Sequence, residues 1–221
     1  MVVAVAIVTP PALVVTGFRV LANDWFVRFE YDRAGFPDDR YGLTRGQRER
    51  LALLGLESIR PGGAGVMLLQ QASLPDGSTA FESREVAHMR DVRVLLRVVL
   101  AFQLVVAITI AVLALGLART RARALVARGL LLGASATIGI ALLCIPLILL
   151  GFDEFFVRFH ELAFEGDSWQ FSRTDTLLRL YPERFWEDTV QLVAAFTVAQ
   201  AVLLAALAWF WLGRFRRGVA A

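Results

Sequence analysis

Residues 94–118 read VLLRVVLAFQLVVAITIAVLALGLA, a nearly continuous apolar stretch in which Arg97 is the single charged side chain. Coiled as a helix, a stretch of this length crosses the roughly 30 Å hydrocarbon core of a bilayer. Three further stretches share this character and occupy residues 1–22, 129–151 and 190–212. The sequence therefore predicts an all-α polytopic membrane protein with four transmembrane helices, and it excludes an ordinary soluble enzyme.

The charged residues between these stretches are sorted by sign. Loop 119–128 and tail 213–221 contain arginine and no acid, whereas all 20 acidic residues lie in segments 23–93 and 152–189. Short loops rich in arginine mark the cytoplasmic side of a membrane protein. We therefore expect a multi-pass protein of the cytoplasmic (inner) membrane with both termini in the cytoplasm. The two acidic segments, and any active site that they carry, are expected on the outer face.

The first apolar stretch is expected to remain as a transmembrane helix. A secretory signal peptide needs a basic segment before its apolar core and a cleavage site of small residues. No basic residue precedes this stretch, and Arg19 lies near its outer end. A retained helix explains this pattern better than a signal peptide.

Composition excludes several kinds of chemistry. All 23 basic residues are arginine, which removes lysine Schiff bases and the Walker phosphate loop. Cys144 is the single cysteine, so an intramolecular disulfide cannot form. We expect no metal site, no cofactor and no nucleic-acid partner.

Segment 23–93 is patterned like a small folded cap. Thr44 can cap a helix that continues to about Ile59. The stretches Val66–Gln71 and Ser78–Phe81 flank a turn rich in proline, aspartate and glycine, which predicts a β-hairpin. The sequence therefore predicts a small extracytoplasmic α+β cap.

The end of this segment is expected to join the second span. Ser83 can cap a helix that continues without a break into residues 94–118. His88 would then lie on a rigid helix just outside the bilayer.

Segment 152–189 begins with an amphipathic pattern. Its charged side chains, among them Asp153 and Arg158, fall on one face of a helical projection, and His160 falls at the boundary between the faces. Such a helix typically lies in the membrane interface instead of crossing the bilayer. The apolar face consists of Phe152, Phe155, Phe156, Phe159 and Leu162.

Two stretches, Ser83–Arg93 and Phe152–His160, resemble motifs of a bacterial integral membrane family, the one that contains lipoprotein intramolecular transacylase (Lit). The first has the pattern Arg-Glu-x-x-His-Met-x-Asp-Val, and the four-span layout is also similar. The chain departs from the family's pattern at Gly166, where asparagine is expected, and at Ser172–Arg173, where Asp-Pro is expected. The second motif continues through Gly166–Trp169, Thr174–Leu177 and Pro182–Trp186.

The resemblance implies an acyltransferase that acts within a bacterial lipoprotein. The acyl chain would move from the sn-2 glyceryl ester to the α-amine of the N-terminal cysteine, which gives a lyso-form product. The implied partners are the diacylglyceryl-modified lipoprotein and membrane phospholipids. Because the nucleophile is the substrate's own tethered amine, the protein needs to supply only a base, an acid and a stabiliser of the oxyanion.

Histidine titrates near neutral pH and suits both proton-transfer roles. His88 and His160 are therefore the expected catalytic residues, and their rings should lie within roughly 10 Å of each other if they share one site. Which of them is base and which is acid stays open. Glu85 and Asp91 lie one helical turn to either side of His88 and either orient its ring or are simply solvated. The expected supporting residues are Arg84, Glu85, Asp91, Asp153, Asp167, Trp169, Asp175 and Glu183.

Other functions compete with this interpretation. The main alternative is a non-catalytic membrane receptor or assembly partner with an extracytoplasmic ligand-binding cap, which should tolerate loss of one histidine. A transporter needs ionisable groups in several spans, and Arg97 is the one candidate. A metal hydrolase needs closely spaced ligands, and the histidines are far apart in the sequence.

Overall fold

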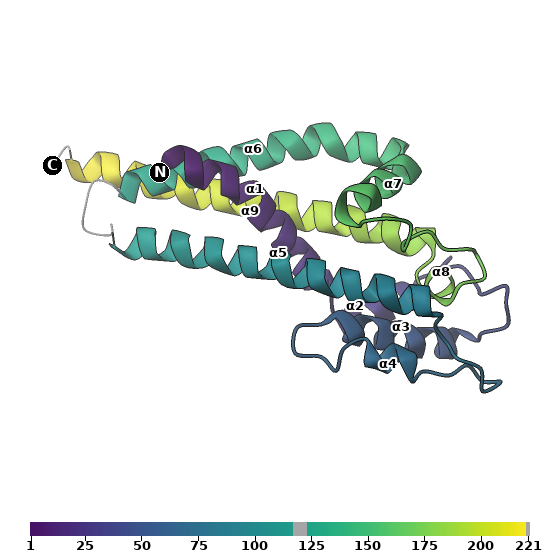
Figure 1. Cartoon of the computed structure of the whole chain (residues 1–221). Coiled ribbons are helices and arrows are strands. Elements are labelled where there is room, and N and C mark those ends of the chain that lie inside the picture. The colour runs from purple at the N-terminus through teal and green to yellow at the C-terminus, as the bar shows by residue number, and fades with distance from the viewer. Residues whose placement is uncertain (117–122, 220–221) are drawn as a thin grey trace. The chain divides into compact units, whose positions relative to one another are not determined.

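The computed structural model describes residues 1–116 and 123–219 (Figure 1). Among these residues, four helices are long and apolar enough to cross a membrane. No β-strand occurs in the described ranges. The chain is therefore an all-α multi-pass membrane protein, as its apolar stretches predict. The long helices are α1 (Val2–Leu21), α5 (Ser83–Gly116), α6 (Arg123–Leu150) and α9 (Glu183–Val219).

Shorter helices occupy the polar segments. The predicted helix after Thr44 is confirmed, because the Thr44 hydroxyl accepts a hydrogen bond from the Gln47 N–H and the Gln47 side chain accepts one from the Thr44 N–H. Such a reciprocal pair fixes the first turn of a helix. No helix was predicted at residues 24–32, 67–70 or 176–180. The short helices are α2 (Asp24–Asp32), α3 (Arg45–Ile59), α4 (Met67–Gln70), α7 (Phe152–Ala163) and α8 (Thr176–Leu180).

The chain forms two compact units, each built from separate parts of the sequence. We call one the apolar unit (Met1–Val20, Leu100–Leu150 and Gln191–Ala221) and the other the polar unit (Leu21–Val99 and Gly151–Val190). Both histidines and all 20 acidic residues belong to the polar unit. Helices α5 and α9 contribute residues to both units.

The β-hairpin predicted for the polar unit is wrong in its first arm, although the predicted turn is present: the Gly77 N–H donates to the Leu74 carbonyl oxygen at 3.0 Å. Its first arm, residues 66–71, contains helix α4 instead, and Leu69 within that helix is fully buried. The β-type pairing in the described residues is a single bridge between Ser73 and Thr79. Methionine, leucine and glutamine favour helix, and an isolated two-stranded ribbon is at best marginally stable in water. The polar unit is therefore all-α and not α+β.

The start of α5 also differs from the prediction. Ser83 is the first helical residue, so it does not cap the helix. The carboxylate of Glu85 instead accepts a hydrogen bond from the backbone N–H of Glu82 at 2.7 Å. As predicted, the helix then continues without a break into the second apolar stretch.

Helix α6 begins at Arg123, within the segment 119–128 that the sequence predicts as a cytoplasmic loop, and continues into the predicted span at residues 129–151. Residues 117–122 lie outside the described part of the chain, and so does the start of the predicted loop. Helix α9 begins at Glu183, directly after Pro182, and continues through the apolar stretch at residues 190–212.

In the apolar unit, two glycines of α6 let α1 approach closely. A Cβ atom on Gly129 would lie 2.7 Å from the Cβ of Val5, and one on Gly133 would lie 2.6 Å from the Cβ of Thr9. Real Cβ atoms do not come this close. Small residues one turn apart are a common means of close helix packing in membranes, and here they form the seam between α1 and α6.

Replacing Gly133 with valine should force α1 and α6 apart. We expect a loss of about 1–3 kcal/mol of stability, the usual cost of overpacking, seen as a lower unfolding temperature of the detergent-solubilised protein. Gly139→Val is the matched control on the same helix, because a Cβ at Gly139 meets nothing within 4 Å. Equal unfolding temperatures for the two variants would contradict the close seam.

Candidate active site

Two histidines face each other in the polar unit. His88 lies near the start of α5 and His160 near the end of α7; their ring centroids are 6.0 Å apart and their planes are inclined by 27°. Both are buried, with 7% and 9% of their surface exposed. The spacing agrees with the limit of roughly 10 Å that a shared site requires.

The bonding of His160 determines which of its ring nitrogens carries the proton. Nδ1 lies 2.7 Å from the carbonyl oxygen of Phe156, one turn earlier in α7. Because a carbonyl oxygen only accepts, Nδ1 carries the proton and Nε2 keeps its lone pair. Burial lowers the pKa of His160, and the hydrogen bond to Phe156 opposes that effect. At neutral pH His160 is therefore neutral, with Nε2 as its proton acceptor.

His88 differs from His160 in its hydrogen bonding. Its Nδ1 is buried and has no hydrogen-bond partner. The rings of Phe164 and Phe171 meet it edge-on, with centroid distances of 4.9 Å and 5.3 Å. Leaving a buried polar atom unpaired costs free energy, so native proteins rarely do so without a functional reason. The unpaired Nδ1 distinguishes His88 from His160, whose Nδ1 is bonded to the Phe156 carbonyl.

Aromatic side chains surround the two imidazoles. Phe156 lies on one side of His160 with ring centroids 4.1 Å apart, and Trp169 lies 5.1 Å from the same ring. Phe164 contacts both histidines, with centroid distances of 4.9 Å to His88 and 5.5 Å to His160. We call this group the aromatic collar. It consists of Phe156, Phe159, Phe164, Trp169 and Phe171.

A second group fastens the start of α5 to the start of α8. Arg84 donates from Nη2 to Oδ1 of Asp175 at 2.7 Å. Glu85 is 1% exposed, and its Oε1 accepts a hydrogen bond from the Leu177 N–H at 2.7 Å. Its other oxygen is occupied by the N–H of Glu82. We call Arg84, Glu85 and Asp175 the α5–α8 clamp.

Four predicted supporting residues lie outside both groups, and all four are exposed. Asp91 interacts with His88 through its charge. Asp167 accepts a hydrogen bond from Gln170 in the loop after α7. Asp153 and Glu183 lie beside each other in the first turns of α7 and α9.

Comparison with known proteins identifies the family. Residues 3–186 match the family described as lipoprotein intramolecular transacylase Lit. The chain belongs to the Lit family. An Aquifex aeolicus protein described as uncharacterized is 31% identical to this Lit-family chain over 187 residues, which cover 84% of the chain and 82% of that protein.

Solved structures share the fold of this Lit-family member. The in meso structure of the membrane integral lipoprotein intramolecular transacylase Lit from Bacillus cereus has a TM-score of 0.78 at 19% identity, and the match covers 98% of this chain and 95% of that one. A variant of the same protein with a histidine replaced by alanine has a TM-score of 0.76, also at 19% identity, covering 98% and 94% of the two chains. The agreement extends over both units.

Part of the collar of this Lit-family chain was not predicted from the sequence. Phe164 and Phe171 lie in the loop between α7 and α8, where no periodic pattern marks a side chain as facing a site. Phe156 was predicted only as part of the apolar face of α7, yet its ring faces His160. One signal in the sequence could have pointed to a turn between Phe164 and Phe171. Gly166 lies between them and has a φ of 67°, a conformation that favours glycine.

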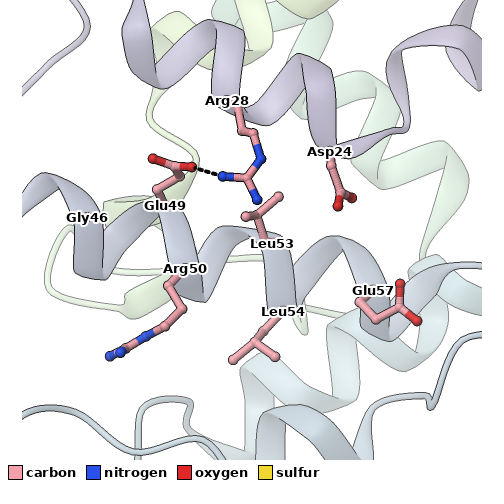
Figure 2. Close-up of a pocket in the computed structure, with 8 residues that line it drawn as sticks. All are labelled: Asp24, Arg28, Gly46, Glu49, Arg50, Leu53, Leu54 and Glu57. Atoms are coloured by element: carbon pink, nitrogen blue, oxygen red, sulfur yellow. Dashed lines mark hydrogen bonds and ion pairs between the residues drawn. The ribbon is translucent and has the colours of Figure 1, made fainter.

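Two open cavities on the polar unit do not coincide with the histidine pair. One of about 500 Å³ lies between α2 and α3, where Arg28 and Glu49 point toward each other and form an ion pair at 2.6 Å (Figure 2). A second, of about 850 Å³, is lined in part by Arg84. Neither is lined by His88 or His160. The candidate active site is therefore defined by its chemistry and not by the size of a cavity.

The lowered pKa of His160 predicts a response to acid. An unperturbed histidine has a pKa of about 6.5, and burial lowers the pKa of His160 in the fold below that value. Below pH 6.5 the unfolded chain therefore binds more protons than the folded one. The contribution of His160 to stability is constant above that pH and falls as the pH drops below it. Proton NMR of the two histidine Cε1–H groups should show His160 titrating below pH 6.5, and His88→Phe assigns the resonance. A midpoint at or above 6.5 would contradict the burial.

Proposed function

We propose that this chain is a lipoprotein intramolecular transacylase whose reaction centre is the histidine pair. In this proposal the acyl chain moves from the sn-2 glyceryl ester to the α-amine of the lipoprotein's N-terminal cysteine. Membership of the Lit family supports the reaction class and the lipoprotein substrate. The observation that supports the position of the site is that His88 and His160 face each other, buried, at 6.0 Å.

The proposed reaction exchanges an ester for an amide. The amine nitrogen attacks the ester carbonyl, an N–C bond forms, and the bond from that carbon to the glyceryl oxygen breaks. The nitrogen loses one proton and the glyceryl oxygen gains one, so neither water nor cofactor is consumed. The substrate supplies the nucleophile, and the enzyme supplies proton transfer and stabilisation of the carbonyl oxygen.

We assign the proton transfer to His160. Its Nδ1–H is held by the Phe156 carbonyl, so Nε2 accepts the proton from the amine. Because burial lowers the pKa of His160, the imidazolium that forms is a relatively strong acid and returns the proton to the glyceryl oxygen. His88 lies opposite, and we assign its unpaired Nδ1 a hydrogen bond to an oxygen of the reacting ester.

The supporting residues have separate proposed roles. The α5–α8 clamp fixes the turn of α5 that carries His88, and Trp169 fixes the ring of His160 by lying against it. The exposed carboxylates are proposed to contact the polar part of the lipoprotein. They are Asp91, Asp153, Asp167 and Glu183.

The substrate's acyl chains lie in the membrane, so the site is proposed at the outer surface of the cytoplasmic membrane. Helix α7 supports this position, because Phe159 and Leu162 are 45% and 90% exposed on its apolar side. The charged side carries an ion pair between Arg158 and Glu154 at 2.7 Å. A helix with two such faces is typical of the membrane interface, where it also meets phospholipids.

Reporter fusions test the proposed orientation. Fusions after Arg123 and after Arg217 should report the cytoplasm, because arginine-rich segments are retained there. Fusions near Gly63 and Asp175 should report the external side. An external signal at Arg123 would place the histidine pair in the cytoplasm and contradict the proposed site.

The decisive experiment is mass spectrometry of a lipoprotein's N-terminal peptide from cells that lack other N-acylating enzymes. With this chain expressed, one acyl chain should move from the glyceryl group to the amine while the total mass stays constant. Fragment ions distinguish the two positions. An unchanged diacylglyceryl peptide in the presence of the folded protein would contradict the proposed function.

A further inference from the structure

Water competes with the amine for the same ester. A base that removes a proton from an amine can also remove one from water. Hydrolysis would then form a C–O bond from water and release a free fatty acid, leaving the cysteine amine unmodified. The tethered amine reacts much faster than water only when it is positioned to attack the carbonyl carbon. When that positioning is incomplete, exclusion of water decides which product forms.

We infer that Phe164 and Phe171 determine the product of the reaction by keeping water away from the ester. This inference rests on the proposed function and adds a specificity role to residues that do not themselves transfer protons. The two rings meet His88 edge-on, inclined by 66° and 71° to its plane. With both in place His88 is 7% exposed, although it lies on a helix of a polar unit.

Phe164 is held in position by the end of α7. Its backbone N–H donates to the carbonyl oxygen of His160 at 2.9 Å and closes the last turn of the helix. The side chain therefore starts from a fixed point beside one histidine, and its ring contacts both. A ring placed in this way covers the space between the two imidazoles from one side.

Phe171 is held by the clamp. The next residue, Ser172, donates from its backbone N–H to Asp175 at 2.7 Å and from its hydroxyl to the same carboxylate at 2.9 Å. That carboxylate accepts from Arg84, which lies one turn before His88 on α5. The ring of Phe171 is thus tied, through three polar contacts, to the helix that carries the histidine it covers.

A purely structural role predicts a different behaviour for these phenylalanines. Core side chains that only pack would, when truncated, lower stability and overall rate while every turnover still gave the N-acylated product. Side chains that exclude water would, when truncated, raise the share of turnovers that end in hydrolysis. The ratio of the two products therefore separates the roles, whatever happens to the rate.

The test compares Phe164→Ala and Phe171→Ala with the unmodified enzyme, each incubated with a diacylglyceryl lipopeptide in water enriched in ¹⁸O. Mass spectrometry counts the N-acylated lyso-peptide against the deacylated peptide and the free fatty acid, which gains one ¹⁸O. We expect the hydrolysed fraction to rise several-fold in both variants. Phe171→Leu keeps the site apolar and should fold even if the alanine variant does not, with a smaller rise.

Phe36→Ala is the matched control. Phe36 is a half-buried phenylalanine of the polar unit that packs against Tyr31 with ring centroids 4.6 Å apart. Its truncation should leave the product ratio unchanged. An unchanged ratio in the Phe164 and Phe171 variants, or an equal rise in the control, would overturn the inference. Absence of acyl shift in the unmodified enzyme would instead contradict the proposed function itself.

Discussion

Substituting either histidine of the pair with phenylalanine should abolish acyl transfer without unfolding the protein. Phenylalanine keeps a flat ring in the aromatic collar but has no nitrogen to accept or donate a proton. Loss of one proton-transferring or hydrogen-bonding group should lower the rate by about 10²–10⁴-fold. For His88→Phe the stability should not fall, because the Nδ1 that is removed is buried and unpaired. Lipopeptide mass spectrometry gives the rate, and tryptophan fluorescence gives the unfolding temperature.

Asp91→Asn is a graded comparison for the His88 substitution. It removes the charge that acts on His88 from an exposed position on the same helix, so it should lower the rate by a smaller factor. A receptor would tolerate loss of one histidine, whereas an enzyme that uses both should not. Near-normal product from either phenylalanine variant would therefore contradict the proposed mechanism.

Glu85→Ala should cause the largest loss of stability in the polar unit. The substitution leaves the backbone N–H groups of Leu177 and Glu82 without their acceptor. An unpaired buried N–H costs about 1–3 kcal/mol. The Leu177 group is fully buried, whereas water can reach the Glu82 group in part. We therefore expect a loss of about 2–4 kcal/mol in the free energy of unfolding, measured by chemical denaturation in detergent.

Two further substitutions, Glu82→Ala and Glu85→Gln, serve as comparisons for Glu85→Ala. Glu82→Ala removes a carboxylate of the same charge from an exposed position where it pairs with Arg84 at 3.2 Å. An exposed pair contributes about 0–1 kcal/mol, so this control should change little. Glu85→Gln keeps one oxygen and should fall between the two alanine variants. Equal stability of Glu85→Ala and Glu82→Ala would show that the clamp is not needed.

The elements that the sequence predicted well are those whose structure depends on residues close together in the sequence. A run such as residues 94–118 is apolar enough to span a membrane whatever the rest of the chain does. Thr44 caps α3 through bonds within its own first turn. The two histidines stand in motifs that resemble those of one family, which brought them together as candidates before any contact was known.

What the sequence did not predict depends on distant pairs. Glu85 was expected either to orient His88 or to be solvated, but it bonds the backbone of Leu177, 92 positions away. Helix α2 was missed because it is short and buries Phe26 and Tyr31 only through contacts made in the fold. Residues 66–71 were assigned to a strand because the turn after them was clear, but burial of Leu69 favoured a helix.

The polar unit has a consequence for how the protein is made. Its first part ends at Val99 and its second begins only at Gly151, so a ribosome must complete the third span before the unit can close. Until then Arg48 and Tyr31 have not met their later partners, the carbonyls of Arg179 and Leu180, 131 and 149 positions away. Before those carbonyls are synthesised, both side chains lack these hydrogen-bond partners. A polypeptide cut short before Gly151 would therefore be a target for quality-control proteases.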